Sequence, residues 1–336
     1  VPMQTRGGGL MYELPLEVIQ EARARISDYI RHTPLAPLPH LQNNVPPQLR
    51  LKLENLQVAG SFKSRGVFNT LLQLSDEAKK RGVIAASGGN HGLSLAYAAY
   101  RLNIPAVVYL PATAGADRAA RISRWNARVI QHGRNWDDAH AKALEHAEQD
   151  GLVYVHAFDT EKTLAGQGTL GLELLDDVPD LDCVLIAIGG GGLISGMATA
   201  IRALKPDVRI IGVEPTGSPA MTRSLAAGQV ISLPEVRTIA DTLSPPTVSD
   251  STLALTQRHV NEVVLVDDPS MIDAMRWLWL NVNQLVEPAG AAVIAALLSG
   301  TVDVSHYHHP VALICGGNAA AEPVWSDYEA RANRGG

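Results

Sequence analysis

The chain has 336 residues, of which 46% are hydrophobic and 18% are charged. This length and composition predict a soluble globular protein with one large or two smaller domains, and they exclude a disordered, coiled-coil or collagen-like chain. The net charge is −6, from 28 Lys and Arg against 34 Asp and Glu, and no basic run occurs. We therefore expect no nucleic-acid partner and no membrane surface.

The compartment is indicated by the cysteines and by the start of the chain. Cys183 and Cys315 are too few for a disulfide framework and lack the spacing of a Cys-x-x-Cys site. Residues 1–10 contain a glycine run and no apolar core of the kind that a signal peptide needs, so we expect a flexible leader. Glycines interrupt the uncharged run 184–201, which argues against a membrane span. A reducing, cytoplasmic location is expected.

The predicted elements alternate between short apolar runs and longer helical patterns. A helix is expected over residues 67–74, and the first complete unit has a strand over 83–86, a helix over 91–102 and a strand over 106–110. Later elements are expected over residues 183–188 (strand), 193–204 (helix), 208–213 (strand), 270–285 (helix), 288–299 (helix) and 311–315 (strand). This order predicts an α/β fold of open twisted parallel sheets with helices on both faces.

The division into domains is less visible in the composition. The polar stretch 159–162 is a plausible crossing point, because Thr160 can cap the helix that follows it. We therefore expect a small α/β domain over residues 76–157. It would be inserted between residues 1–75 and 158–336, which together form a larger domain.

Four consecutive glycines, residues 189–192, lie between a predicted strand and a predicted helix. Amide groups at a helix start have no partner within the helix, and the helix dipole is positive there, so this run predicts an anion site. A nucleoside-triphosphate loop is excluded, because no Lys-Ser or Lys-Thr pair follows the glycines. A dinucleotide site stays open, because Glu214 ends the next predicted strand, where a ribose-binding carboxylate would lie.

A second strand-to-helix turn of this type has the sequence Ser-Gly-Gly-Asn-His-Gly, residues 87–92. Its backbone amides and the Ser87 hydroxyl suit a carboxylate, a smaller anion than a phosphate ester. Ordinary turn and cap chemistry would account for Ser87 and Asn90 equally well. Two anion sites on one sheet nevertheless indicate one ligand with a phosphate and another with a carboxylate.

Lys63 lies in the turn Gly-Ser-Phe-Lys-Ser-Arg-Gly, residues 60–66, just before a predicted helix. The positive end of the helix disfavours the charged form of lysine and lowers its pKa. A neutral amine is what a Schiff-base lysine must supply. Taken alone, a lysine in this position is more often solvated, so its significance depends on the two anion turns that accompany it.

Together, these segments resemble the fold-type II pyridoxal-phosphate enzymes, and among them the serine/threonine dehydratases and serine racemases. The similar motifs follow the order of that family, at residues 31–35, 52–57, 60–66, 87–92, 189–192, 212–215, 286–291 and 315–318. The resemblance implies the two-lobed fold of the β subunit of tryptophan synthase. It also implies that the larger domain binds pyridoxal 5′-phosphate and that the protein is a homodimer.

The resemblance implies a role for each matching residue. Lys63 looks like the lysine that holds the cofactor as a Schiff base and moves the α-proton of the substrate. Phe62 would pack beside the cofactor ring, Asn90 would donate to its 3′-oxygen, and Cys315 would face the pyridine nitrogen. Because a thiol is a weak hydrogen-bonding partner, that nitrogen should stay largely unprotonated, which favours prompt elimination.

The remaining implied contacts concern the two anions. The cofactor phosphate would be held by Gly189, Gly190, Gly191, Gly192 and Leu193. The substrate carboxylate would be held, mainly through backbone amides, by Ser87, Gly88, Gly89, Asn90 and His91.

Two positions depart from the patterns of this family. Gly88 stands where racemases place a second serine that transfers a proton, so we expect racemisation to be minor. Ala220 stands where some members have an aspartate that binds a divalent cation together with the equivalent of Glu214. No metal is therefore predicted.

The predicted activity is that of a pyridoxal-phosphate-dependent dehydratase, or ammonia-lyase, which converts an amino acid of the serine or threonine type into a 2-oxo acid and ammonia. Hydroxyaspartate and phenylserine stay open as substrates, because residues 241–246 replace the glycine-rich stretch expected near the substrate side chain. Two further activities stay open: β-replacement with the same cofactor and, from another class, a nicotinamide-dependent oxidoreductase that uses the glycine run.

Overall fold

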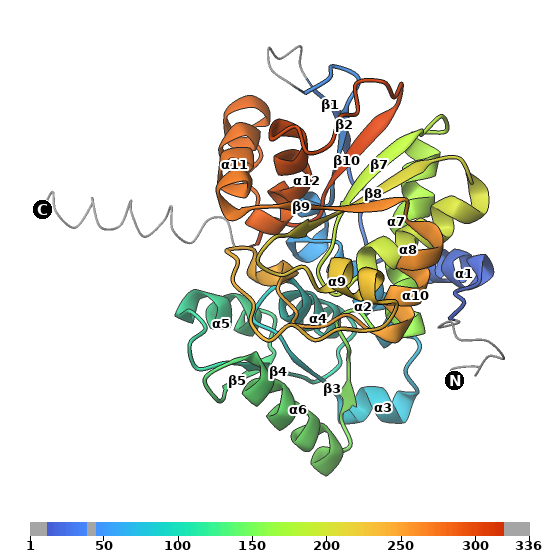
Figure 1. Cartoon of the computed structure of the whole chain (residues 1–336). Helices are drawn as coiled ribbons and strands as arrows, with labels where there is room; N and C mark the ends of the chain where they lie inside the picture. Colours follow the sequence, from blue (N-terminus) through green and yellow to red (C-terminus); the bar gives the residue numbers. More distant parts are fainter. Residues whose placement is uncertain (1–11, 39–44, 319–336) are drawn as a thin grey trace, which may run out of the picture.

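Residues 12–38 and 45–318 are described by a computed structural model, whose chain course is shown in Figure 1. The expected flexible leader, residues 1–10, lies outside the described residues. Strands and helices alternate along the chain and form two separate sheets. The predicted α/β class is therefore confirmed.

The larger sheet has the strand order β1-β2-β10-β7-β8-β9. These strands are β1 (Leu35–Pro37), β2 (Arg50–Leu53), β7 (Cys183–Ala187), β8 (Arg209–Pro215), β9 (Glu262–Val266) and β10 (Pro310–Ile314). All neighbours run parallel except the edge pair β1 and β2. Every residue of β7 and β10 is buried, as expected of central parallel strands that are covered on both faces.

The smaller sheet has the strand order β5-β4-β3-β6, and all its neighbours run parallel. Its strands are β3 (Val83–Ala86), β4 (Ala106–Leu110), β5 (Arg128–Gln131) and β6 (Val153–Tyr154). All four lie within the segment 76–157, for which the sequence predicts an inserted domain. The exact domain division stays a prediction.

Helices cover both sheets. The α-helices are α1 (Leu16–Ile26), α2 (Lys63–Leu72), α3 (Asp76–Arg81), α4 (Asn90–Arg101), α5 (Ala116–Ser123), α6 (Trp136–Asp150), α7 (Glu161–Asp177), α8 (Gly192–Leu204), α9 (Ala220–Ala227), α10 (Asp250–His259), α11 (Asp268–Val282) and α12 (Pro288–Leu298). Short 3₁₀ helices are η1 (Glu54–Leu56), η2 (Val58–Gly60) and η3 (Asp241–Leu243). Figure 1 shows α11 and α12 on one face of the larger sheet and α7 and α8 on the other.

Two helix ends differ from the prediction for a physical reason. Helix α11 ends at Val282 rather than at residue 285, because Asn283 adopts the left-handed conformation that terminates a helix. Helix α2 begins at Lys63 rather than at residue 67. Its start is fixed by the residues directly after β10, since the Phe62 amide donates to the Cys315 carbonyl at 3.2 Å and Ser61 bridges to Gly316.

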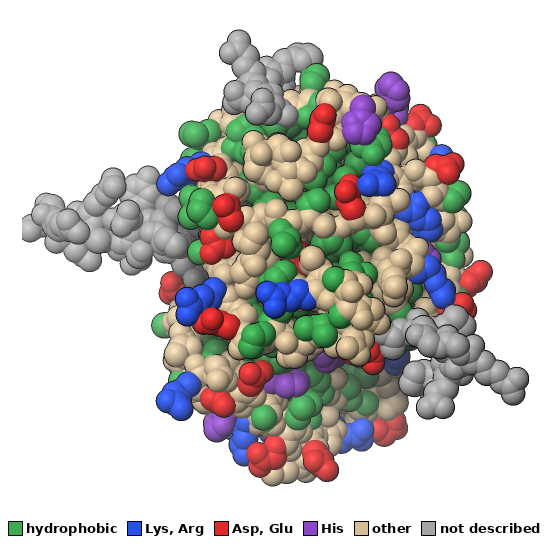
Figure 2. Space-filling model, in the orientation of Figure 1, with side chains coloured by type: hydrophobic (Ala, Val, Ile, Leu, Met, Phe, Trp, Pro, Cys, Tyr) green, Lys and Arg blue, Asp and Glu red, His purple; other side chains and the backbone are tan. Residues whose placement is uncertain are grey.

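Other local predictions can be compared directly with the structure. Thr160 caps α7 as expected, because its hydroxyl accepts from the Thr163 amide at 3.1 Å. Among the described residues, no helix has the length and apolar character needed to cross a membrane, and the uncharged run 184–201 is divided between β7 and α8. Figure 2 shows acidic and basic side chains interspersed over one face of the molecule.

A buried network of charged side chains joins α2 to η1 and α7. Arg65 donates to the two carboxylate oxygens of Glu54, at 2.9 and 2.7 Å, and to Glu173 at 2.8 Å. Arg65 and Glu54 are almost fully buried. Burial alone would lower the pKa of Arg65, but the two carboxylates outweigh that effect and raise it. Arg65 thus stays charged and holds the start of α2 in place.

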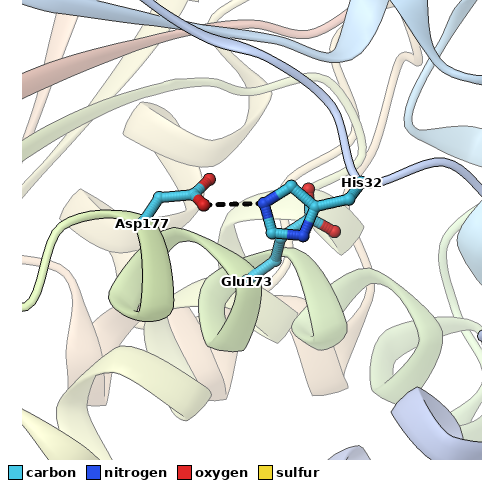
Figure 3. Close-up of side chains that lie close together, drawn as sticks. All are labelled: His32, Glu173 and Asp177. Atoms are coloured by element: carbon cyan, nitrogen blue, oxygen red, sulfur yellow. Dashed lines mark hydrogen bonds and ion pairs between the residues drawn. The ribbon is translucent and has the colours of Figure 1, made fainter.

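Lys52 extends this network toward the surface. Its Nζ lies 2.7 Å from Glu173 and 2.6 Å from Asp177, and it donates to the Thr33 carbonyl at 2.8 Å. His32 Nε2 lies 2.6 Å from the second oxygen of Asp177, as Figure 3 shows. The side chains of His32, Glu173 and Asp177 are close enough to bind a metal. Because the Lys52 ammonium contacts both carboxylates, we interpret this cluster as an ion-pair network.

Replacing Arg65 by methionine should lower the free energy of unfolding by about 3–5 kcal/mol, because two buried carboxylates lose their partner. Arg209→Met removes an exposed pair with Glu262 and is the control, which should cost no more than about 1 kcal/mol. Urea denaturation of both variants measures the difference. Similar losses in the two variants would contradict the anchoring role of Arg65.

Candidate functional site

The predicted site residues follow strands of both sheets. Ser87 comes directly after β3, Gly189 comes shortly after β7, and Cys315 comes directly after β10. In open parallel sheets, ligands bind beyond the carboxyl ends of the strands. The site therefore lies where this fold places ligands, and the side-chain contacts show which residues meet there.

Lys63 is the first residue of α2, and its side chain is half-buried. Nζ donates to the Ala157 carbonyl at 2.8 Å and lies 5.1 Å from the centre of the Phe62 ring. Burial lowers the pKa of Lys63 to about 8. The amine is therefore neutral far more often near neutral pH than that of a solvated lysine, as covalent chemistry at Nζ requires.

Cys315 is a buried thiol near Lys63. Its Sγ donates to the Ala289 carbonyl at 3.5 Å, and its exposed fraction is 2%. Burial, and then the negative charge of Glu287, raise the pKa of Cys315. The group therefore stays a neutral thiol, the weak hydrogen-bonding partner that the sequence predicts.

Asn90 begins α4 and is held by two side chains from other parts of the chain. Its Nδ2 donates to the Glu287 carboxylate, and its Oδ1 accepts from Asn318 Nδ2 at 2.7 Å. Glu287 is the buried N-cap residue of α12, and Thr242 Oγ1 lies 3.4 Å from the same carboxylate. Because an amide nitrogen carries two hydrogens, Asn90 can donate to Glu287 and to a ligand together.

The glycine run forms the start of α8. Gly191 has a left-handed backbone (φ 86°) and supplies no side-chain cap to the helix. A Cβ on Gly190 would lie 2.5 Å from the Phe158 ring, and one on Gly192 would lie 2.8 Å from Phe158 Cβ. Glycine is therefore needed here, and the first amides of α8 lack partners within the helix, as the predicted anion site requires. Leu193 follows in the first turn and is buried.

Glycine residues of the predicted substrate turn line a pocket. Ser87 Oγ accepts from the Gly89 amide at 3.3 Å. Gly88 and Gly89 form part of a pocket that is partly open to solvent. Its wall also includes Arg118, Arg121, Thr242, Glu287 and Asn318.

The His91 ring is turned into the protein. Its Nε2 donates to the Val155 carbonyl at 2.8 Å, and the side chain is buried. Burial, and then the charge of Lys63, lower the pKa of His91 to about 3. The ring is therefore neutral, and its Nε2–H is already used, so a contact with substrate through the His91 amide stays the simpler prediction.

The Glu214 carboxylate is bound by the start of α9. It accepts from the Met221 amide at 2.7 Å, the Thr222 amide at 3.0 Å and the Thr222 hydroxyl at 2.8 Å. Burial raises the pKa of Glu214 to about 7. Its oxygens satisfy the start of α9, which removes the feature that favoured a dinucleotide site.

Sequence reasoning missed four polar side chains of the pocket wall: Arg118, Arg121, Glu287 and Asn318. Glu287 and Asn318 lie inside motifs that it identified, but no role was predicted for them. A signal for Glu287 was its place directly before Pro288, which begins a helix. A signal for the arginines was their helix, which follows β4 on the same sheet as the substrate turn.

The assembled groups fit pyridoxal 5′-phosphate. They include a lysine amine of lowered pKa, an oriented asparagine amide, a neutral thiol and a helix start where a Cβ on Gly190 or Gly192 would collide with Phe158. Two buried polar atoms near these groups, Ser61 Oγ and His91 Nδ1, have no hydrogen-bond partner within the described part of the chain. Such atoms indicate a ligand or ordered water.

Comparison with known proteins agrees with this assignment. The family model described as pyridoxal-phosphate dependent enzyme matches residues 26–316. The L-threonine ammonia-lyase of Thermotoga maritima is 38% identical over 286 residues, covering 85% of this chain and 71% of that enzyme. The serine racemase of Oryza sativa subsp. indica is 36% identical over 318 residues, covering 94% of each chain.

A solved structure shows the same fold. The structure of maize serine racemase matches with a TM-score of 0.90 at 34% sequence identity, covering 96% of this chain and 99% of that one. The likeness covers 96% of the chain and so extends over both sheets. The chain therefore belongs to the fold-type II pyridoxal-phosphate-dependent enzymes, in the group of the threonine dehydratases and serine racemases.

Proposed function

We propose that the protein is a lyase that converts a β-hydroxy amino acid into a 2-oxo acid and ammonia. The observation that carries this choice over racemisation is Gly88. It stands where racemases carry a second proton-transferring serine, and it lines the pocket beside the substrate turn. Glycine has no side chain that could return a proton to the opposite face of the substrate.

Lys63 is the proposed base. The cofactor, when bound, supplies stabilisation of the negative charge that develops at the α-carbon. Lys63 Nζ takes the α-proton, and its lowered pKa of about 8 makes the neutral amine available for this. The β-hydroxyl takes up a proton and leaves as water, and hydrolysis of the released enamine gives the 2-oxo acid and ammonia. The amides of residues 87–91 orient the substrate carboxylate, so that the α-hydrogen is presented to Nζ.

Other residues hold the cofactor in this proposal. Asn90 donates to its 3′-oxygen while Glu287 and Asn318 fix the amide plane. Residues 189–193 hold the phosphate at the start of α8, and Phe62 packs beside the ring. Cys315, kept neutral by burial, leaves the pyridine nitrogen largely unprotonated. The homodimer and the cytoplasmic location are part of the same proposal.

The first test of the proposed lyase function concerns Lys63. Borohydride treatment of the purified protein should fix the cofactor on Lys63, as identified by peptide mass analysis. Lys63→Ala should lower the rate of ammonia release by about 10²–10⁴-fold or more, because the base is lost. Lys80→Ala, at an exposed lysine of α3, is the control and should retain activity. Full activity in Lys63→Ala would refute the proposal.

The second prediction concerns pH. In the cofactor-free protein, the rate of covalent uptake of pyridoxal phosphate by Lys63 should rise as the pH approaches about 8 and level off above it, because only the neutral amine attacks the aldehyde. Stopped-flow absorbance in a series of buffers measures this midpoint. A midpoint near the ordinary lysine value of 10.5 would show that burial does not tune this amine.

The third prediction concerns Gly88. Gly88→Ser should raise the ratio of racemisation to ammonia release by about tenfold or more, because it adds a proton donor opposite Lys63. A new Cβ would meet only side chains there, the closest at 3.3 Å. Gly115→Ser, where a Cβ meets nothing within 4 Å, is the control. With L-serine as the substrate, chiral chromatography measures the D-serine formed, and an ammonia assay measures the competing reaction. An unchanged ratio in Gly88→Ser would count against the assignment.

A further inference from the structure

Two arginines of α5 form one wall of the pocket beside the substrate turn. Arg118 lies against the turn itself, because a Cβ on Gly88 would be 3.7 Å from Arg118 Cδ. Arg121 Nη2 donates to Asn318 Oδ1 at 2.6 Å, and its Nη1 donates to the Asn318 carbonyl. Both side chains line the same pocket as Gly88 and Gly89, which are predicted to hold the substrate carboxylate.

The carboxylate that pairs with Arg118 can be exchanged for that of a ligand. Arg118 Nη1 lies 2.5 Å from Asp241 Oδ2, and the Asp241 side chain is 40% exposed at the rim of the pocket. An incoming carboxylate that replaced Asp241 would keep the charge of Arg118 balanced. Asp241 would turn into water at little cost, since exposed ion pairs are weak.

The negative charge of Glu287 does not oppose such a ligand strongly. The Glu287 carboxylate accepts from Asn90 and lies at the N-terminus of α12, where the helix dipole offsets part of the negative charge of Glu287. Arg121 uses one hydrogen of each terminal nitrogen on Asn318, and each of these nitrogens carries a second hydrogen that a carboxylate can accept. The hydrogen or methyl group at the β-carbon of serine or threonine would use neither arginine.

We infer that the pocket selects a β-hydroxy amino acid with a second acidic group, of which 3-hydroxyaspartate is the simplest. Arg121 contacts the distal carboxylate, and Arg118 lies between this carboxylate and the substrate turn. Arg121 is thus a specificity-determining residue. This inference depends on the proposed lyase function for the reaction, but the recognition of a second acid can be tested by binding alone.

The first experiment measures turnover by the holoenzyme. The value of kcat/KM for ammonia release should be at least about tenfold higher with a 3-hydroxyaspartate stereoisomer than with L-serine or L-threonine. One charge-assisted hydrogen bond provides enough binding free energy for a difference of about this size. Arg121→Met should lower this value by about 10–100-fold for 3-hydroxyaspartate and change it little for L-serine. Arg124→Met, at an exposed residue after the same helix, is the control. A preference for serine or threonine, or an equal loss on all substrates, would overturn the inference.

The second experiment measures binding without turnover. Succinate and butyrate have the same number of carbons but differ by one carboxylate, so calorimetry with the holoenzyme reports the second acid directly. Succinate should bind at least about tenfold more tightly. This preference should disappear in Arg121→Met, return in part in Arg121→Lys and persist in Arg124→Met. Thermal unfolding of each variant confirms that it is folded.

The two experiments separate the two proposals. If no β-hydroxy amino acid releases ammonia but succinate is preferred through Arg121, the lyase function is wrong and the acid-binding pocket stands. If ammonia is released but succinate and butyrate bind equally, the lyase function stands and the inference about the second acid is wrong.

Discussion

The position of the Lys63 amine depends on the buried ion pair between Arg65 and Glu54. Arg65 lies on the same first turn of α2 as Lys63, and its contacts to Glu54 and Glu173 fix that turn between η1 and α7. Buried ion pairs seldom add stability compared with apolar packing, but they permit only a narrow range of geometries. We interpret the network as a device for positioning Lys63, at a cost in stability that the surrounding core offsets.

In the buried network the side chains stay charged, whereas burial favours the neutral forms of Lys63 and the groups around it. Burial lowers the pKa values of Lys63 and His91 and raises that of Cys315. One physical cause, the loss of water, thus favours the neutral form of an amine, an imidazole and a thiol within one site. The carboxylates of the buried network pair with Arg65 and Lys52 rather than with the Lys63 amine. This division suits the roles proposed for Lys63, whose amine would both form a covalent bond and accept a proton.

The sequence predicted the parts of this arrangement that depend on local pattern. The alternation of buried strands and amphipathic helices revealed the α/β fold, and the glycine run, the substrate turn and Lys63 are all short motifs. The pairing of Asn90 with Glu287 and that of Arg121 with Asn318 each join residues 197 positions apart. Such contacts depend on how the two sheets meet, which no local pattern records. The end of α11 was missed for a smaller reason, the left-handed conformation of Asn283.

Chemistry and selectivity are placed on different elements of the fold. The residues proposed to act at the α-carbon and on the cofactor lie at the starts of α2, α4 and α8 and after β10, whereas the outer pocket wall comes from α5 and η3. Substitutions in that wall can therefore change the accepted side chain without moving Lys63. The contacts Arg118–Asp241 and Arg121–Asn318 also join α5, which follows a strand of the smaller sheet, to segments that follow strands of the larger one. A substrate carboxylate that bound these arginines would connect α5 to the same segments after the strands of the larger sheet. Recognition of the substrate side chain would then be coupled to enclosure of the α-carbon beside Lys63.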